Sequence, residues 1–304
     1  MAAVLETGQM PSEPGDEVGR GYLYTETPDT HGTNLPNVST SESGSSSETI
    51  RDISVIVPAW NEVEHLGATL ERYLPVLESI ADRLEVLVIV DGPPDGTREV
   101  VQKFAERDVR LIEFPERLGK GGALIEGMKA AQYDCVGFID ADGPVSPDDL
   151  RSIISKVTWF DSVIGSRWID GSHFVQPQTL GRIAAGRVWN ILVRLFLSLP
   201  LADTQCGVKF FRKDSLRRAL GKVTVTNWAF DAALLYEILQ TGGTVMECPV
   251  TWSDRPQSKL TVSKAAPAML ASLVSIRASS SRMWRIFPPR LLARVASWDH
   301  KGPL

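Results

Sequence analysis

Two acidic residues that share one short turn give the strongest chemical signal in this sequence. Asp140 and Asp142 follow the apolar run 136–139, with one alanine between them, and Gly-Pro comes directly after. An apolar run that is broken by glycine and proline indicates a buried strand that ends in a tight turn. Two carboxylates at such a strand end can bind one hard divalent cation together with a substrate diphosphate. A lone D-x-D pattern is common, however, and by itself it is more often only an acidic turn.

Acidic residues also follow two earlier strand-like segments. Glu62 comes just after the β-branched run 53–57, and Asp91 comes directly after the apolar run 84–90. In open α/β sheets, ligands bind beyond the carboxyl ends of the strands. Acidic residues at three successive strand ends are therefore expected to meet in one cavity, and this clustering predicts a nucleotide site.

The elements that must position these acids alternate along the chain. The sequence pattern predicts strands at 53–57, 84–90, 109–114, 135–139 and 208–211, and helices at 64–80, from Thr97, and at 123–131. This order predicts an α/β protein with a parallel, doubly wound sheet. The segment 118–122 contains three glycines and Lys120, but its spacing fits neither a P-loop nor G-x-G-x-x-G. We interpret it as a flexible loop, although it could instead contact a nucleotide phosphate.

Composition separates an acidic tail from a nearly neutral body. The 304 residues are 43% apolar, and the net charge is −5. Residues 1–50 contain eight acidic residues and one basic residue, which gives −7 there and leaves +2 for the remainder. This distribution argues against nucleic acid as a partner. Residues 1–50 are also rich in Gly, Pro, Ser, Thr and Glu, so a disordered tail is predicted.

Cysteine usage and hydropathy favour a cytoplasmic protein. The three cysteines are widely spaced and suggest neither a disulfide framework nor a zinc site. No apolar run approaches the roughly 20 residues of a membrane helix. The N-terminus lacks the order of a signal peptide. A protein that is soluble or bound at a membrane surface is expected.

The order of short motifs resembles that of the inverting family 2 glycosyltransferases. The matching strings are V-P-A-W-N-E at 57–62, D-G-P-P-D-G-T at 91–97, D-A-D at 140–142 and G-S-R at 165–167. The strings at 119–123, 203–211, 228–236 and 258–260 are most similar to those of dolichyl-phosphate β-glucosyltransferases, with dolichyl-phosphate mannose synthases nearby. The resemblance covers residues 51–265, and the ordered set of motifs is far more specific than any one of them.

This resemblance implies a GT-A fold, which is a Rossmann-like, mostly parallel sheet with added amphipathic helices. It divides the chain into a tail (1–50), a catalytic domain (51–264) and a basic, aromatic C-terminal segment (265–304). The implied reaction moves a hexose from a nucleotide sugar to a polyprenyl or dolichyl phosphate, with Mg²⁺ or Mn²⁺ as cofactor. UDP-glucose is the expected donor, and GDP-mannose is the second candidate. Two other hypotheses compete with this one. The first is a non-catalytic scaffold that binds sugar nucleotides, which the retained D-x-D pair disfavours. The second is a transferase for a soluble acceptor, which the phosphate-binding arginines disfavour.

The resemblance also assigns expected roles to individual residues. The donor nucleotide would contact Pro58, Ala59, Glu62, Asp91, Lys120 and Asp140. The metal would be held by Asp140 and Asp142. The acceptor phosphate would be bound by Arg167, Arg182, Arg255 and Lys259. Asp231 occupies the position of a catalytic acidic residue. Because a phosphate monoester is already largely a dianion at neutral pH, Asp231 is expected to orient cationic groups instead of removing a proton.

Two segments suggest contact with a membrane surface. Apolar residues recur with helical spacing along 180–199, and Arg187, Asn190 and Arg194 lie on the opposite side of that helix. A core-facing helix and a lipid-facing helix both fit this pattern. The segment 265–304 combines six basic residues after position 276 with interleaved aromatic residues, which suits an anionic membrane surface. We therefore expect peripheral attachment at the cytoplasmic face of a membrane.

Overall fold

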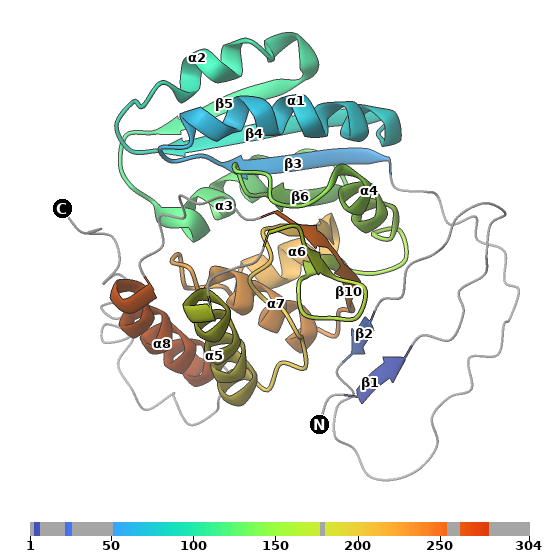
Figure 1. Cartoon of the computed structure of the whole chain (residues 1–304), viewed down its shortest axis with the longest axis vertical. Helices are drawn as coiled ribbons and strands as arrows, with labels where there is room; N and C mark the ends of the chain where they lie inside the picture. Colours follow the sequence, from blue (N-terminus) through green and yellow to red (C-terminus); the bar gives the residue numbers. More distant parts are fainter. Residues whose placement is uncertain (1–2, 7–21, 26–50, 177–179, 254–261, 280–304) are drawn as a thin grey trace, which may run out of the picture.

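A mixed β-sheet lies between two layers of helices (Figure 1). The computed structural model describes residues 3–6, 22–25, 51–176, 180–253 and 262–279. Within these residues the large sheet has the order β1-β2-β10-β7-β9-β6-β3-β4-β5. Its strands are β1 (Ala3–Glu6), β2 (Tyr22–Thr25), β3 (Asp52–Pro58), β4 (Arg83–Asp91), β5 (Val109–Phe114), β6 (Cys135–Ile139), β7 (Ser162–Ser166), β9 (Val208–Arg212) and β10 (Val245–Pro249). A small second sheet pairs β8 (His173–Phe174) with β11 (Thr251–Trp252).

The seven strands of this sheet from β3 onwards are mostly parallel, as the sequence predicts, with one informative exception. Strands β6, β3, β4 and β5 run parallel to one another, and β7 runs parallel to β10. Strand β9 lies between β6 and β7 and is antiparallel to both. The residues after β6 and those before β9 therefore lie at the same edge of the sheet. This arrangement brings a late part of the chain next to Asp140.

Helices cover both faces of the sheet. They are α1 (Val63–Ile80), α2 (Thr97–Gln102), the 3-10 helix η1 (Ala105–Arg107), α3 (Gly119–Ala130), α4 (Pro147–Ser155), α5 (Leu180–Leu197), α6 (Lys213–Leu220), α7 (Phe230–Gln240) and α8 (Val262–Ser279). One apolar core joins α1, α2 and α4 to the sheet, and a second core joins α3, α5, α6, α7 and α8 to its other face. Two covered faces are what a doubly wound fold requires.

Strand β4 illustrates why these residues form central strands. Val86, Val88 and Val90 enter one core, and Leu87 and Ile89 enter the other. Successive side chains in a strand point to opposite faces, so a continuous apolar run suits a strand that is buried on both sides. The predicted strands at 53–57, 84–90, 109–114, 135–139 and 208–211 are all present with small differences at their ends. The GT-A type of fold expected from the family resemblance is confirmed.

The prediction of a flexible loop at 118–122 is wrong, because Gly119 begins helix α3. Gly121 and Gly122 are buried in the first turn of this helix. A Cβ atom on Gly121 would lie 2.6 Å from the Thr226 carbonyl oxygen and 2.7 Å from the Phe230 Cβ. The Gly122 N–H donates to the same Thr226 oxygen at 3.2 Å. These glycines therefore permit close packing against the chain before α7, and flexibility is not their function.

Two short strands occur within the predicted disordered tail. Strand β2 pairs antiparallel with β10, and β1 pairs antiparallel with β2. The prediction of disorder does not hold for these eight residues, whose β-branched, aromatic and leucine residues favour strands. The other residues between 1 and 50 lie outside the described part of the chain, as do the aromatic residues after position 279. The expected boundary at 264/265 falls inside α8.

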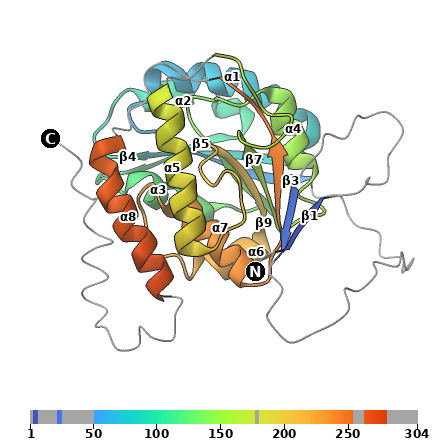
Figure 2. The ribbon, with the colours of Figure 1, turned by 60° about the horizontal axis from the view of Figure 1, so that its bottom comes forward.

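Helices α5 and α8 lie side by side on one side of the molecule (Figure 2). Helix α5 buries Val193 and Leu197 but leaves Val188, Ile191 and Leu195 exposed by 56%, 55% and 71%. The predicted apolar stripe is thus largely at the surface. Asn190, predicted to lie on the polar side, is buried instead. Among the described residues, no helix has the length and apolar character needed to cross a membrane.

The tight packing at Gly121 gives a stability prediction. Gly121→Ala should lower the free energy of unfolding by about 1–3 kcal/mol, because the added methyl group meets backbone atoms that cannot move aside. Gly181→Ala is the matched control, since no atom lies within 4 Å of its Cβ position. That variant should be neutral or stabilising by up to about 1 kcal/mol. Urea unfolding measures both; equal stability of the two variants would contradict the packing role.

Candidate functional site

The D-x-D turn is held by the backbone on both sides. Asp140 directly follows β6, and its N–H donates to the Gly207 carbonyl at 2.9 Å. The Gly143 N–H donates to the Asp140 carbonyl at 3.0 Å, and Gly143 has a φ of +55°, which favours glycine. Gly207 must also lack a side chain, because a Cβ there would overlap the Asp140 carboxylate. The position of this carboxylate is therefore fixed by two glycines.

Glu62, Asp140 and Asp142 form an acidic cluster at the ends of β3 and β6. Burial raises the pKa of Asp142 to about 6, and the negative charges of Asp140 and Glu62 contribute to this rise. This mutual influence means that the three carboxylates share one region, as the sequence analysis expects. Glu62 stands at the beginning of α1, directly before its first turn. Negative charges that lie close together in a partly buried place repel one another, so a bound cation would stabilise them.

The donor set suits a divalent cation that is shared with a substrate. In the part of the chain that the structure describes, no group of three or more His, Cys, Asp or Glu side chains could hold a metal ion alone. Mg²⁺ is commonly bound through one or two carboxylates together with substrate phosphates and water. Asp140 and Asp142 supply such a pair of oxygen ligands. The residues present therefore fit a metal that is completed by a nucleotide diphosphate.

A chain of alternating charges runs from Asp140 into the protein interior. The Lys120 Nζ lies 2.9 Å from Asp140 Oδ1 and 3.7 Å from Asp231 Oδ2. The Lys209 Nζ donates to Asp231 Oδ1 and to the Cys206 carbonyl, both at 2.6 Å. Lys209 and Asp231 are buried almost completely. Burial acts to lower the pKa of Lys120, but the carboxylates of Asp140 and Asp231 outweigh it, so the pKa is raised.

Asp91 binds protein groups that anchor the beginning of α3. Its Oδ2 accepts the N–H groups of Leu118 and Gly119, each at 2.8 Å. Its Oδ1 accepts from Arg117 at 2.6 Å. The carboxylate is buried, and these three bonds use most of its acceptor capacity. Asp91 therefore positions the helix turn that carries Lys120, a role that the sequence analysis did not expect.

An aromatic and cationic pair lies next to Asp91. The Arg117 guanidinium lies 3.9 Å from the centre of the Trp60 ring, which is 43% exposed. Arg117 also donates to the Asp91 carbonyl at 2.9 Å. Pro58 is half-buried, whereas Ala59 is buried and donates its N–H to the Ile89 carbonyl at 2.8 Å. A flat, exposed ring beside hydrogen-bonding groups is suited to stacking against a base.

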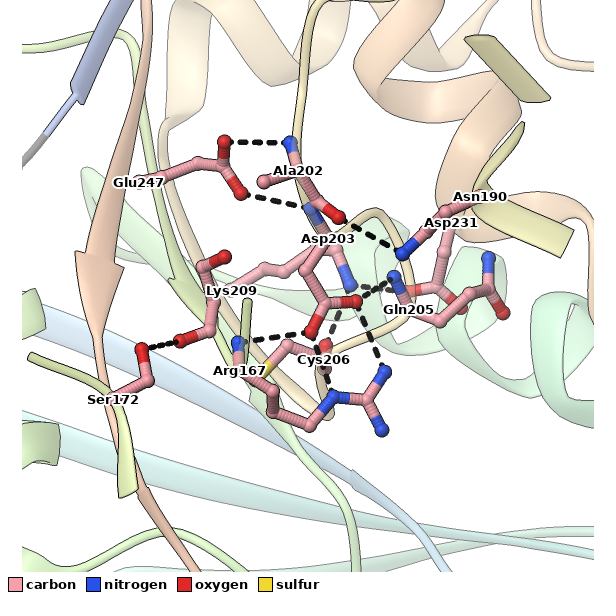
Figure 3. A network of polar contacts seen from close by, with 11 residues as sticks. Arg167, Ser172, Asn190, Ala202, Asp203, Gln205, Cys206, Lys209, Asp231 and Glu247 are labelled. Atoms are coloured by element: carbon pink, nitrogen blue, oxygen red, sulfur yellow. Dashed lines mark hydrogen bonds and ion pairs between the residues drawn. The ribbon is translucent and has the colours of Figure 1, made fainter. Parts of the chain in front are cut away.

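Arg167 belongs to a second buried network (Figure 3). Its Nε and one terminal nitrogen donate to the two Asp203 carboxylate oxygens at 2.7 and 2.9 Å. Burial would raise the pKa of Asp203, but Arg167 outweighs this and lowers it. Glu247 in turn accepts the N–H groups of Ala202 and Asp203 at 2.8 and 2.9 Å. Burial raises the pKa of Glu247 to about 7, against the effect of these bonds.

Further contacts connect Arg167 and the segment around Asp203 to Trp252 and to helix α5. The Arg167 guanidinium lies 4.7 Å from the centre of the Trp252 ring. Asn190 of α5 donates to the Ala202 carbonyl at 2.8 Å, which links this helix to the segment before Asp203 (Figure 3). The plane of the guanidinium is thus fixed by a bidentate carboxylate, the geometry in which arginine binds most specifically.

The predicted site residues fall into two groups. Pro58, Ala59, Glu62, Asp91, Lys120, Asp140, Asp142, Arg167 and Asp231 all lie at the ends of strands or in the networks described above. Arg255 and Lys259 lie outside the described residues, and so does the side chain of Arg182. A groove of about 430 Å³ between α3 and α6 contains none of these residues.

Five further residues were missed by sequence reasoning. They are Trp60, Arg117, Gly207, Lys209 and Glu247. Two of them carried a usable signal, because a charged residue inside an apolar strand is seldom buried unless it is paired. Lys209 in Val208–Arg212 and Glu247 in Val245–Pro249 both fit that description. Trp60 and Arg117 carried no comparable signal.

The buried ion pair yields a second stability prediction. Lys209→Met should cost about 3–5 kcal/mol of unfolding free energy, because buried Asp231 loses its hydrogen-bonded partner and keeps only Lys120, 3.7 Å away. The double variant Lys209→Met/Asp231→Asn should recover part of this loss. Lys129→Met removes an exposed ion pair with Glu126 and should cost less than about 1 kcal/mol. Denaturant unfolding of all three variants gives the comparison, and a Lys209 loss as small as that at Lys129 would contradict the pairing.

The sequence of this chain is similar to those of several known proteins. Residues 54–220 match the model of glycosyl transferase family 2. Glycosyltransferase AglD of Haloferax volcanii is 33% identical over 69% of this chain, which spans 34% of that protein's length. The dolichyl-phosphate beta-glucosyltransferase of Drosophila melanogaster is 33% identical over 69% of each chain. The undecaprenyl-phosphate mannosyltransferase of Micrococcus luteus is 30% identical over 67% of this chain and 84% of its own.

A solved structure supports the fold independently. Glucosyl-3-phosphoglycerate synthase from Mycobacterium tuberculosis, in complex with Mn²⁺, UDP and glucosyl-3-phosphoglycerate, superposes with a TM-score of 0.56 at 18% identity. The match covers 76% of this chain and 82% of that one. At this identity the likeness concerns the fold. The family match, which covers more than half of the chain, shows that this chain belongs to glycosyl transferase family 2 and is a glycosyltransferase.

Proposed function

We propose that this glycosyltransferase moves glucose from UDP-glucose to a dolichyl or other polyprenyl phosphate, with inversion at the anomeric carbon. Two kinds of observation support this proposal. The names of relatives with about 30% identity include polyprenyl-phosphate glucosyl- and mannosyltransferases. The site itself combines an acidic cluster, which suits a metal and a diphosphate, with an arginine that is oriented by a buried carboxylate.

The donor nucleotide is bound near the ends of β3 and β4 in this proposal. Trp60 offers a stacking surface for the base, and Glu62 offers carboxylate oxygens for hydroxyl or N–H groups. Lys120 faces the diphosphate. Asp140 and Asp142 would hold Mg²⁺ or Mn²⁺, which supplies positive charge to the departing diphosphate when it is bound.

The proposed acceptor is a phosphate, which is already negatively charged. The burial and pairing of Asp231 support an acceptor of this kind. Asp231 is buried and paired with Lys209 at 2.6 Å, so it is poorly placed to remove a proton. A phosphate monoester needs no base, because it is largely a dianion at neutral pH. One of its oxygens attacks the anomeric carbon while the bond to the diphosphate oxygen breaks and its electron pair leaves with the nucleotide. No proton moves, and Arg167 orients the phosphate.

GDP-mannose is the second candidate donor. The similarity to the undecaprenyl-phosphate mannosyltransferase of Micrococcus luteus favours it. An aromatic ring and a carboxylate, as at Trp60 and Glu62, suit uracil and guanine alike. The two donors therefore have to be compared directly.

The proposed acceptor requires access to a membrane surface. Val188, Ile191 and Leu195 form an exposed apolar strip on α5, and Leu270 and Val274 are exposed by 40% and 44% on the neighbouring α8. Arg187 and Arg194 are exposed on the same helix as the strip. Apolar residues beside basic ones suit the interface of an anionic bilayer. We propose that α5 and α8 rest on the membrane at its cytoplasmic face, with Arg167 nearby.

A transfer assay tests the reaction and the metal together. Radiolabelled UDP-glucose or GDP-mannose is offered with a short-chain polyprenyl phosphate and with Mg²⁺, Mn²⁺ or EDTA. Product should form with UDP-glucose and metal, and Asp142→Asn should lower turnover at least about 100-fold by removing a metal ligand. Asp148→Asn, the same change at an exposed residue of α4, should leave turnover unchanged. Turnover that persists in EDTA and in Asp142→Asn would remove the metal from the mechanism.

Vesicle flotation tests the membrane surface. The triple variant Val188→Ser/Ile191→Ser/Leu195→Ser should bind vesicles of mixed neutral and anionic lipid at least about tenfold more weakly, because it loses apolar area at the interface. Trp159→Ser is the control, since Trp159 is 64% exposed but follows α4, away from α5. If the triple variant floats with the vesicles as well as the wild type does, the exposed strip is not the membrane contact.

A further inference from the structure

The ammonium group of Lys120 lies beside Asp140, one of the two carboxylates that would hold a metal. Its Nζ lies 2.9 Å from Asp140 Oδ1, and only 11% of its side chain is exposed. The rings of Phe138 and Trp228 lie 5.7 and 5.4 Å from the same nitrogen, at distances typical of cation–π contacts. A fully charged ammonium group thus neutralises one of the two carboxylates that would hold a metal.

A second position for this ammonium group is available nearby. Asp231 Oδ2 is buried, 3.7 Å from the Lys120 Nζ, and it has no hydrogen-bond partner within the described ranges. Its other oxygen is held by Lys209 at 2.6 Å, so the carboxylate cannot turn away. A movement of about 1 Å would bring Lys120 to hydrogen-bonding distance of Asp231 Oδ2. Asp231 therefore offers an unused acceptor beside the occupied one.

We propose that Lys120 is a built-in counter-ion of Asp140, which a divalent cation displaces towards Asp231 and the donor diphosphate. The proposal rests on the metal site at Asp140 and Asp142 proposed above. In the absence of nucleotide, Lys120 competes with the cation and keeps its affinity low. When a nucleoside diphosphate binds, its negative charge attracts Lys120 and releases Asp140 for the metal. Metal and nucleotide binding are then positively coupled through one side chain.

The charge balance of the cluster supports this exchange. The cluster contains four carboxylates, those of Glu62, Asp140, Asp142 and Asp231, and the two ammonium groups of Lys120 and Lys209. Two negative charges remain, which one divalent cation would neutralise. While Lys120 contacts Asp140, it neutralises part of the negative charge that would attract the cation. After the shift, Asp231 holds two lysines and Asp140 is available to the metal.

Binding of Mn²⁺ to the nucleotide-free protein tests the proposal without any turnover. Free Mn²⁺ is counted by electron paramagnetic resonance during titration of the full chain. Lys120→Met should bind Mn²⁺ at least about tenfold more tightly than the wild type, because a positive charge close to the metal is removed. Lys120→Arg keeps the charge and should bind as weakly as the wild type. Lys129→Met, on the exposed side of the same helix, should change nothing.

Addition of UDP tests the coupling. Saturating UDP should increase the Mn²⁺ affinity of the wild type by a larger factor than that of Lys120→Met, which has no counter-ion to release. An equal increase in both would overturn the coupling, and an unchanged or weaker Mn²⁺ affinity of Lys120→Met would overturn the counter-ion role. Lys120→Gln serves as a second uncharged variant if the methionine variant does not fold. Because these titrations contain no sugar donor or lipid, they can succeed even if the transfer assay fails.

Discussion

The buried pair of Lys209 and Asp231 is the interaction on which the rest of the site depends. Both charges are removed from water, and each would be strongly destabilising alone. Lys209 also donates to the Cys206 carbonyl, so it fixes the chain just before β9 as well as the first turn of α7. From Asp231 the alternation of charges continues through Lys120 to Asp140. Buried Lys209 thus influences, through Asp231 and Lys120, how the negative charge of Asp140 is neutralised.

The fold makes this arrangement possible by inserting an antiparallel strand into a parallel sheet. Lys209 pairs with Phe138 in the register of β9 and β6, and Gly207 then lies beside Asp140. The acidic turn after β6 is therefore supported by a segment that comes much later in the chain. Glu247 on β10 supports the loop before β9 in a comparable way through Asp203. The segments that carry Asp140 and Arg167 are thus both stabilised by buried charges on strands of the sheet.

Much of this organisation could be predicted from sequence, and the missing part has a physical reason. Asp140, Asp142 and Glu62 are visible because they follow apolar runs, and the order of strands and helices fixes the edge at which they meet. The pairing of Lys209 with Asp231 was not visible, since it depends on where β9 enters the sheet. The glycines of 119–122 were misinterpreted for a similar reason. Their role is set by Thr226 and Phe230, which are distant in sequence and close in space.

The hydrogen bond from the Asp140 N–H to the Gly207 carbonyl extends the ladder between β6 and β9 by one rung. The main chain at this end of the molecule is consequently as firmly held as the sheet itself. Binding and release of an ion at the proposed metal site would then require movement of side chains such as Lys120, and not of the main chain. The exchange of charged partners proposed for Lys120 is therefore a local event, which can proceed without opening the sheet.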